Sequence, residues 1–323
     1  MAEAARALWV TSAGTCEIRP VALPACPPDQ VEVRTLHSAV SRGTESLVLQ
    51  GRIPASQHQR MRAPFQEGEF PWPVKYGYLN VGVVEGGPPG WEGRTVFCLF
   101  PHQTRYVVPV GAVTPVPPEV PPERAVLAGT VETAINALWD AGPLIGDRVS
   151  VVGGGMVGCA VTALLARFPG VEVQLVDVDP ARGTTASALG ASFATPADAV
   201  GDRDLVVHAS GSEEGLTRSL ELLAAEGRVV ELSWYGDRRV SLPLGESFHS
   251  RRLTVRSSQV GVVAHPHRDH GERMALALRL LADPVFDSLI TGASRFEEMP
   301  ELLSGELPAL CHRIDYGADH ARW

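Results

Sequence analysis

The pattern of apolar and polar positions divides the chain into two parts. Up to about residue 125, short β-prone runs are separated by many proline and glycine residues, which predicts a compact, mostly antiparallel β-rich domain. Beyond that point strand-like and helix-like segments alternate, which predicts a parallel, doubly wound sheet. The expected strands are residues 31–36, 81–85, 95–100 and 105–110 in the first part, and 148–152, 171–176, 204–208, 228–232 and 253–255 in the second.

Helical periodicity fills the intervals between the later strands. Apolar residues at i, i+3, i+4, i+7 and i+8 give one helix face over residues 157–165. Leu216, Leu220 and Leu223 mark the face of a further helix. Helices are also expected at residues 125–141, 181–189 and 273–281, and a terminal strand at residues 311–316.

A glycine-rich turn stands between the first strand of the alternating part and the helix that follows. Gly153, Gly155 and Gly158 fit the Gly-x-Gly-x-x-Gly pattern. In this pattern the glycines allow a tight turn, the close approach of a pyrophosphate, and close packing of helix on strand. The helix N-terminus then offers free N–H groups and a positive dipole end to phosphates. Because strand, turn and helix occur in the right order, the sequence predicts a dinucleotide-binding unit.

The next strand ends close to Asp177, which lies 19 residues past Gly158. A carboxylate there accepts hydrogen bonds from the adenosine ribose and repels a 2′-phosphate, which favours NAD over NADP. Arg182 is near enough in sequence to meet a phosphate, so NADP stays open as an alternative. The expected cofactor contacts are Gly153, Gly155, Met156, Val157, Gly158, Asp177, Val178, Arg182 and Ser210.

Composition and charge narrow the range of partners. The 323 residues suffice for two domains with full cores. The formal net charge of −9 argues against a nucleic-acid surface, which needs clustered Lys and Arg, and Lys75 is the only lysine. No apolar run reaches the roughly 20 residues that span a bilayer. The five cysteines are scattered without a Cys-x-x-Cys pair. These features predict a cytoplasmic protein with a small-molecule substrate and no membrane or nucleic-acid partner.

The order of parts resembles the medium-chain dehydrogenase/reductase superfamily, in which a Rossmann domain is inserted into a β-rich catalytic domain. The similar segments are PVKYGYLNVGVVE at 73–85, GTVETA at 129–134 and DRVSVVGGGMVG at 147–158. The resemblance covers nearly the whole chain and implies an α/β fold. It predicts a GroES-like catalytic domain at residues 1–128 and 262–323, and a Rossmann domain with a doubly wound parallel sheet at residues 129–261.

A narrower resemblance points to a reaction type. The segments SRGTE at 41–45, KYGY at 75–78 and VETAINAL at 131–138 are similar to the subgroup that contains bacteriochlorophyllide dehydrogenase. That enzyme oxidises a hydroxyethyl group to an acetyl group with NAD. The resemblance therefore implies hydride transfer at a secondary alcohol or ketone, without naming the substrate.

The residues at the superfamily's zinc positions argue against zinc here. Zinc-type members use a Cys, the His and often the Glu of a Gly-His-Glu stretch, and a Cys or Glu at the entry to the cofactor domain. The residues at these places are Ser41 or Arg42, Tyr78, Leu79 and Gly129. None of these is a thiolate, imidazole or carboxylate, the ligands that zinc uses. Glu45, His102 and Glu132 make a possible replacement set, but they are scattered without ligand spacing.

Without a metal, another group must polarise a carbonyl or take an alcohol proton. Tyr78 is the first candidate, because the superfamily's metal-ligand position points into the reaction cleft and a phenol can donate or accept a proton. Glu45 and Glu132 are candidate relays, and His102 lies in a loop after a strand, a position suited to chemistry. An ordinary packed, structural or solvated role is the alternative for each of these residues.

Further contacts are implied by the resemblance and by the strand ends. Thr133 resembles a position that touches the nicotinamide, and Arg313 resembles a late arginine that reaches the pyrophosphate. Trp234 and Tyr235 follow the strand expected at residues 228–232, and ligands of doubly wound folds sit beyond the carboxyl ends of strands. The candidate substrate contacts are Ser41, Arg42, Tyr235 and Gln259.

These observations predict a zinc-independent, NAD(P)-dependent oxidoreductase that acts on a secondary alcohol or ketone of a small or mid-sized molecule. One alternative is a reductase of activated C=C bonds, as in the zinc-free quinone and enoyl reductases. An alternative of another class is a nucleotide-binding sensor or structural protein without turnover. Because members are commonly oligomers, a homodimer is expected, with its seam at the edge strand near residues 253–256.

Overall fold

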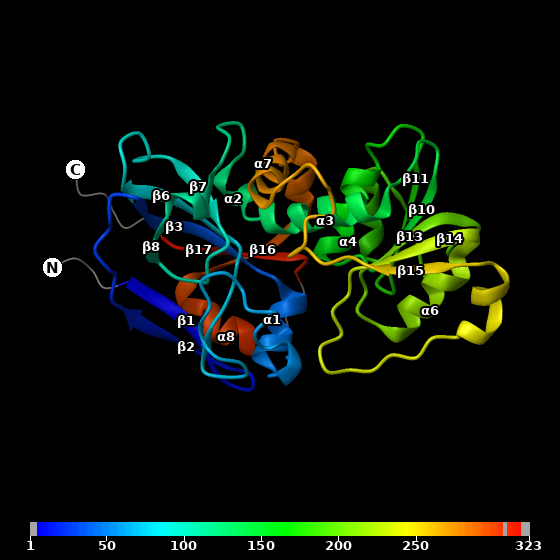
Figure 1. The fold of residues 1–323 in the computed structure, drawn as a ribbon, viewed down its shortest axis with the longest axis horizontal. Coiled ribbons are helices and arrows are strands. Elements are labelled where there is room, and N and C mark those ends of the chain that lie inside the picture. Colours follow the sequence, from blue (N-terminus) through cyan, green and yellow to red (C-terminus); the bar gives the residue numbers. More distant parts are fainter. Residues whose placement is uncertain (1–4, 306–308, 318–323) are drawn as a thin grey trace. The chain divides into compact units, whose positions relative to one another are not determined.

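The computed structural model describes residues 5–305 and 309–317, which form two compact units (Figure 1). The β-rich unit extends to Gly129 and includes residues 278–282 and the described residues from 290 onward. The α/β unit comprises residues 130–277 and 283–289. None of the helices in the described ranges is long and apolar enough to cross a membrane.

The α/β unit is built on a six-stranded parallel sheet with the order β12-β11-β10-β13-β14-β15. The chain enters at β10 in the middle and winds outward in both directions, which is the doubly wound order. Right-handed connections therefore place α4 and α6 on opposite faces of the sheet, as Figure 1 shows. The strands are β10 (Arg148–Val152), β11 (Glu172–Val176), β12 (Ser192–Ala194), β13 (Arg203–His208), β14 (Leu223–Glu231) and β15 (Thr254–Ser257). The helices are α3 (Ala128–Ala141), α4 (Met156–Leu165), α5 (Arg182–Leu189), α6 (Glu213–Leu222) and α7 (His270–Leu280).

The expected elements of this unit differ from the observed ones at two places. The helix expected at residues 125–141 is interrupted, so that α2 (Pro122–Ala125) precedes α3. Leu223, expected on the face of α6, instead begins β14, because its backbone is extended (φ −70°, ψ 146°) directly after the helix ends. The outer strand β15 is exposed along all four residues, and the homodimer seam expected there stays a prediction.

The β-rich unit contains two sheets, whose pairings are antiparallel except for β16 with β17. One has the order β2-β1-β5-β4, and the other has the order β16-β17-β3-β6-β7-β9 with β8 also paired to β3. The bounds are β1 (Ala5–Ser12), β2 (Thr15–Val21), β3 (Gln30–Val40), β4 (Glu67–Gly68), β5 (Val74–Lys75), β6 (Asn80–Gly86), β7 (Thr95–Cys98), β8 (Arg105–Pro109), β9 (Val113–Pro115), β16 (Ile290–Arg295) and β17 (Cys311–Asp315). Short helices α1 (Arg42–Leu49) and α8 (Met299–Ser304) belong to the same unit.

The second crossing between the units lies later in the chain than the expected boundary at residues 261 and 262. Most of α7 belongs to the α/β unit, which ends its long segment at Ala277. The reason is a buried ion pair between Arg273 of α7 and Glu132 of α3, with Nε and Oε1 3.0 Å apart. Arg273 also donates to the carbonyl oxygen of Val260 over 2.6 Å, so α7 holds the preceding loop against α3.

The single lysine of the chain is buried in the β-rich unit. Lys75 is 1% exposed; its ammonium is paired with Glu67 and donates to Oε1 of Gln103 over 2.7 Å. The ammonium also lies 5.4 Å from the centre of the Phe100 ring. Burial outweighs the attraction of Glu67, and the pKa of Lys75 is therefore below its ordinary value.

Candidate functional site

The glycine turn of the α/β unit is shaped by the absence of side chains. Gly153 has a φ of +107°, and a Cβ there would lie 2.5 Å from the backbone nitrogen of Ser210. A Cβ at Gly158 would lie 1.9 Å from the carbonyl oxygen of Gly153, so α4 can pack this closely only on a glycine. A Cβ at Gly155 would meet nothing within 4 Å, which leaves open space at the N-terminus of α4. The clashes at Gly153 and Gly158 match the tight turn and the close helix packing that the motif assigns to its glycines, and the approach of a pyrophosphate at Gly155 stays a prediction.

The first helical residues and the end of β11 complete this turn. Met156 is buried and Val157 partly exposed in the first turn of α4, where helical N–H groups have no partner within the helix. Asp177 accepts hydrogen bonds from the backbone N–H of Gly154 over 2.5 Å and of Asp179 over 2.8 Å. A Cβ at Gly154 would lie 3.2 Å from Cγ of Arg182. Asp177 and Arg182 therefore both lie beside Gly154.

Val178 is the most exposed residue of this group, with 80% of its surface accessible. A large apolar side chain left open beside the Asp177 carboxylate offers a flat contact for a ring. Asp177, Val178 and Arg182 thus come together at one end of the glycine turn, where the sequence places the adenosine half of a dinucleotide.

A second polar group gathers at the other side of the turn, beyond the carboxyl ends of β13 and β14. His208 is fully buried at the end of β13, with Nε2 2.6 Å from Oγ of Ser210 and Nδ1 2.7 Å from Oε2 of Glu231. Glu231 ends β14 and also accepts from the backbone N–H of Ser233 over 2.6 Å and from Tyr235 Oη over 3.1 Å. We call His208, Ser210, Glu231, Ser233 and Tyr235 the His208 cluster.

The β-rich unit holds a separate polar cluster around α1. Tyr78 Oη donates to Oγ of Ser41 over 2.6 Å. The Glu45 carboxylate, in the first turn of α1, accepts from the backbone N–H of Ser41 over 2.7 Å and lies 3.0 Å from Nε2 of His102. We call this group, with its two further members below, the His102 cluster.

The chain of contacts continues into the interior. Nδ1 of His102 is 2.7 Å from Oγ of Ser38, which is 3.0 Å from Oη of Tyr316. Ser38, Glu45 and His102 are all buried. Gly77 makes room for the imidazole, because a Cβ there would lie 2.8 Å from Cδ2 of His102. Three of the four predicted catalytic residues, Tyr78, Glu45 and His102, are therefore brought together.

Burial and the Glu45 charge raise the pKa of Tyr78 to about 12, although hydrogen bonds with Ser41 and Thr44 lower it. Tyr78 is consequently a neutral phenol near pH 7. Tyr78 is partly exposed as a residue, whereas Tyr316 at the other end of the cluster is buried. The arrangement can donate a proton or a hydrogen bond to an oxygen that carries developing negative charge.

The fourth predicted catalytic residue lies elsewhere. Glu132 is 4% exposed in the α/β unit, paired with Arg273, and Arg273 also donates to Oδ1 of Asn136 over 2.5 Å. Burial outweighs the attraction of Arg273, and the pKa of Glu132 is raised. The structure gives Glu132 a structural partner within the α/β unit, and a catalytic role for it stays a prediction.

The positions at which zinc was considered hold Ser41, Tyr78, Leu79 and Gly129, and zinc independence stays a prediction. Ser41 and Tyr78 are hydrogen-bonded to each other, and a Cβ on Gly129 would lie 2.6 Å from Cδ2 of Leu79. Within residues 5–305 and 309–317, no three His, Cys, Asp or Glu side chains come together as a metal site. The donor set at these positions therefore lacks the thiolate, imidazole and carboxylate groups of a zinc centre.

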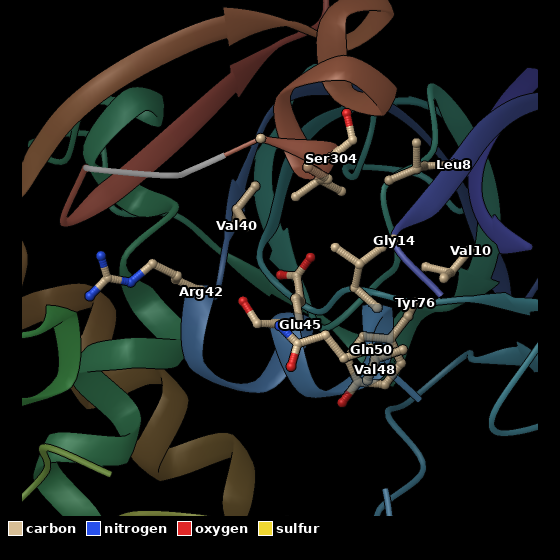
Figure 2. A pocket seen from close by; sticks show the side chains of 14 residues that line it. Leu8, Val10, Gly14, Val40, Arg42, Glu45, Val48, Gln50, Tyr76 and Ser304 are labelled. Atoms are coloured by element: carbon tan, nitrogen blue, oxygen red, sulfur yellow. The ribbon is translucent and has the colours of Figure 1, made fainter. Parts of the chain in front are cut away.

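A pocket of about 260 Å³ opens beside the His102 cluster, within the β-rich unit. Its walls are mainly apolar, from β1, α1 and α8, and Glu45 and Tyr76 also line it (Figure 2). Figure 2 shows the guanidinium of Arg42 turned away from the other labelled side chains, and this residue is exposed. The pocket has room for part of a small organic molecule.

The remaining predicted contacts are dispersed. Thr133 and Trp234 are partly buried in the α/β unit, while Gln259 is exposed and bonds the backbone N–H of Gly261 over 2.7 Å. Tyr235 belongs to the His208 cluster. Arg313 forms an ion pair with Asp315 over 2.7 Å in the β-rich unit. A role for each of these residues stays a prediction.

Sequence reasoning missed Ser38, Tyr316, His208 and Glu231. His208 and Glu231 each end a strand of the parallel sheet, and that position was a usable signal because ligand groups collect at strand ends. Ser38 and Tyr316 gave no local signal. They meet only because β17 pairs with β3, where Ile314 stands opposite Ser38.

No protein-family model matches the sequence. Among solved structures, the chain is similar to a short chain alcohol dehydrogenase from Escherichia coli CFT073 complexed with NADH, with a TM-score of 0.78 and 15% identity over 97% of this chain and 99% of that one. It is also similar to 2R,3R-butanediol dehydrogenase from Bacillus subtilis, with a TM-score of 0.76 and 16% identity over 97% and 100%. For the alcohol dehydrogenase TADH from Thermus sp. ATN1 the TM-score is 0.74, with 21% identity over 96% and 99%. The chain therefore has the fold of these dehydrogenases, which confirms the α/β architecture expected from the sequence, a β-rich domain joined to a Rossmann domain.

Proposed function

We propose that the protein is a zinc-independent, NAD(P)-dependent oxidoreductase that transfers hydride between the nicotinamide and a secondary alcohol or ketone. The observation that carries the proposal is the glycine turn, in which a Cβ at Gly153 or Gly158 would clash while the space at Gly155 is open. That is a cradle for a pyrophosphate at a helix N-terminus. The similar dehydrogenase from Escherichia coli CFT073 was solved with NADH.

The cofactor preference proposed is NAD. Asp177 holds a carboxylate against Gly154, where the adenosine ribose of a dinucleotide would offer its hydroxyls. The same charge would repel a 2′-phosphate. Arg182 also lies beside Gly154, and it is the residue through which the 2′-phosphate of NADP would bind instead.

The chemistry divides between the cofactor and the chain. A bound nicotinamide dinucleotide supplies or accepts the hydride. Tyr78 Oη donates a hydrogen bond to the substrate's carbonyl oxygen and passes its proton there as negative charge develops. The Ser41 hydroxyl, which accepts from Tyr78 at rest, can turn to donate to the phenolate that remains.

The raised pKa of Tyr78 suits its phenol to act as a proton donor. An alkoxide is a stronger base than a phenolate, so proton transfer from Tyr78 to a reduced carbonyl is favourable. The same residue takes the proton back when the reaction runs toward oxidation of the alcohol.

The first test is titration of metal-stripped protein with NADH and NADPH, followed by a screen of ketones, aldehydes and enones. Tighter binding of NADH and turnover of a ketone support the proposal. Tighter binding of NADPH would shift the cofactor assignment to Arg182, and turnover of enones alone would assign C=C reduction. Binding without any turnover would indicate a sensor or structural protein, and binding of neither cofactor would remove the oxidoreductase assignment.

The second test is Tyr78→Phe, which removes the hydroxyl and keeps the ring. Loss of a positioned general acid should lower kcat by about 10²-fold while the Kd for NADH is unchanged. Tyr106→Phe is the matched control, since the Tyr106 hydroxyl also donates a hydrogen bond, to Oδ1 of Asn80, and bonds Cys98, both outside the His102 cluster. Unchanged kcat in Tyr78→Phe would show that another group supplies the proton.

A further inference from the structure

The pocket in the β-rich unit is not used by the proposed chemistry. It is formed by β1, α1 and α8, which all belong to that unit, whereas the glycine turn belongs to the α/β unit. An apolar cavity of about 150 Å³ in a protein core can hold a benzene molecule. The volume of about 260 Å³ therefore admits a six-carbon chain or ring together with a head group.

Most of the pocket wall is apolar. Leu8 and Val10 of β1, Val48 of α1 and Leu303 of α8 all line it, and each of these side chains is otherwise enclosed by the protein. Apolar surface of this kind gains free energy when an apolar group replaces water against it. The walls therefore favour a ligand with an apolar body.

One carboxylate interrupts the apolar wall. Glu45 is 8% exposed, and Figure 2 shows its carboxylate turned from α1 toward the middle of the labelled side chains. Oε1 accepts a hydrogen bond from the backbone N–H of Ser41, and Oε2 accepts one from Nε2 of His102. A carboxylate has about four lone-pair sites in total. Glu45 thus keeps acceptor capacity for a donor that enters the pocket.

The charge of Glu45 also acts on the groups around the pocket. Burial raises the pKa of the Cys16 thiol to about 12, and the Glu45 charge adds to this rise. Burial and the neighbouring Tyr78 raise the pKa of Tyr76, which lines the pocket, and Glu45 raises it further. A field that disfavours negative charge on its neighbours favours a cation. The guanidinium of Arg42, the other charged residue of the wall, is turned away from the labelled side chains (Figure 2).

We propose that this pocket is a binding site for a small primary amine, with the ammonium group on Glu45 and the carbon chain against β1 and α8. An ammonium group is a compact cation with three donors, which suits the acceptor sites that Glu45 has left. Charge-assisted hydrogen bonds are about twice as strong as neutral ones, so an alcohol would bind less tightly and a carboxylate would be repelled. The inference does not depend on the proposed function, since the glycine turn lies in the α/β unit.

The experiment measures the binding of three probes with the same carbon chain and different head groups: n-hexylamine, n-hexanol and hexanoate. Calorimetry near neutral pH and at physiological ionic strength should give n-hexylamine an affinity about tenfold higher than that of n-hexanol, and no binding of hexanoate. Glu45→Gln keeps the size of the side chain and one acceptor oxygen, and should reduce the affinity for n-hexylamine to that for n-hexanol. In the same variant n-hexanol should bind within about twofold of its native affinity, which shows that the pocket is intact.

The location is tested by filling the pocket. Ser304 lines it and is exposed, so Ser304→Phe adds bulk to the wall without disturbing the buried core. This variant should weaken n-hexylamine and n-hexanol alike, by about tenfold. Ser56→Phe, at an exposed position outside the pocket, is the matched control and should change neither affinity.

Four results would overturn the proposal. Native protein that fails to bind n-hexylamine would refute the site, and equal affinities for n-hexylamine and n-hexanol would refute the ammonium contact. Amine binding that Glu45→Gln leaves unchanged would reflect general attraction to the net charge of −9. Unchanged binding of both ligands in Ser304→Phe would place them elsewhere on the protein.

Discussion

The two units contain the same trio of side chains in different settings. In the β-rich unit, His102 lies between Glu45 and Ser38; in the α/β unit, His208 lies between Glu231 and Ser210. The two imidazoles present different ring nitrogens to their carboxylates. Glu45 faces Nε2 of His102, whereas Glu231 faces Nδ1 of His208.

The trios differ in where they end. Ser38 is 1% exposed and passes its contact on to Tyr316, so the His102 cluster is closed on the interior side. Ser210 is exposed, so the His208 cluster reaches the surface of the α/β unit at this residue. The comparison teaches that residue types alone do not determine what a histidine–carboxylate pair does. Its role depends on whether the group at the end of the chain of hydrogen bonds is exposed or buried.

The largest expected effect on this comparison comes from a substitution that fills the glycine turn of the α/β unit. Gly158→Val would force α4 away from Gly153, whose carbonyl oxygen lies 1.9 Å from the added Cβ. NADH binding, measured by nicotinamide fluorescence, should fall by more than about 100-fold, since the pyrophosphate cradle is lost.

Gly201→Ala is the control for that variant, because a Cβ there meets only the carbonyl oxygen of Leu222, at 3.9 Å. It should bind NADH as the native protein does. Native affinity in Gly158→Val would contradict the assignment of the turn as the cofactor cradle.

The next comparison replaces each histidine by leucine. His102→Leu leaves the buried Glu45 carboxylate with the Ser41 N–H as its hydrogen-bond donor in the cluster, and should lower the free energy of unfolding by about 3 kcal/mol. His208→Leu leaves Glu231 with the Ser233 and Tyr235 donors, so a loss of about 1 kcal/mol is expected. Urea midpoints measure both, and a larger loss at His208 would reverse the contrast between closed and open clusters.

The smallest expected effect is a pH dependence confined to alkaline conditions. The pKa of Tyr78 is about 12 in the folded protein, above the ordinary value of 10 that the unfolded chain has. Its contribution to stability is therefore complete below pH 10 and is lost as pH rises toward 12. Thermal midpoints of Tyr78→Phe should fall less steeply over that window than those of the native protein, and equal slopes would mean that Tyr78 ionises as a solvated phenol does.

The sequence alone was sufficient to predict those parts of the molecule whose residues are neighbours in the chain. The glycine turn, its strand and its helix lie within residues 148–165, and each residue's task follows from its neighbours in the chain. Asp177 was predicted for the same reason, since the length of one strand–helix–strand unit sets its spacing, and its contact with a ribose stays a prediction. The confirmed α/β fold follows from the alternation of the same short segments.

The remaining parts depend on contacts between distant segments. Tyr78, Glu45 and His102 were chosen separately as candidates, but the order of their hydrogen bonds needs α1 and the loop after β7 to be folded together. The role of Glu132 depends on Arg273, 141 residues away. No local pattern could distinguish a free carboxylate in α3 from one that fastens α7 to it.

The burial of Lys75 has a practical consequence for labelling. Acylating esters and reductive methylation need an accessible, uncharged amine, and the only lysine side chain of this protein is enclosed in the β-rich unit. Modification of that amine therefore records the moments when the unit opens, and the mass of the peptide that contains Lys75 gives the opened fraction directly. For the same reason, coupling to a surface through lysine would select unfolded protein, whereas arginine-directed cleavage would still reach the native chain.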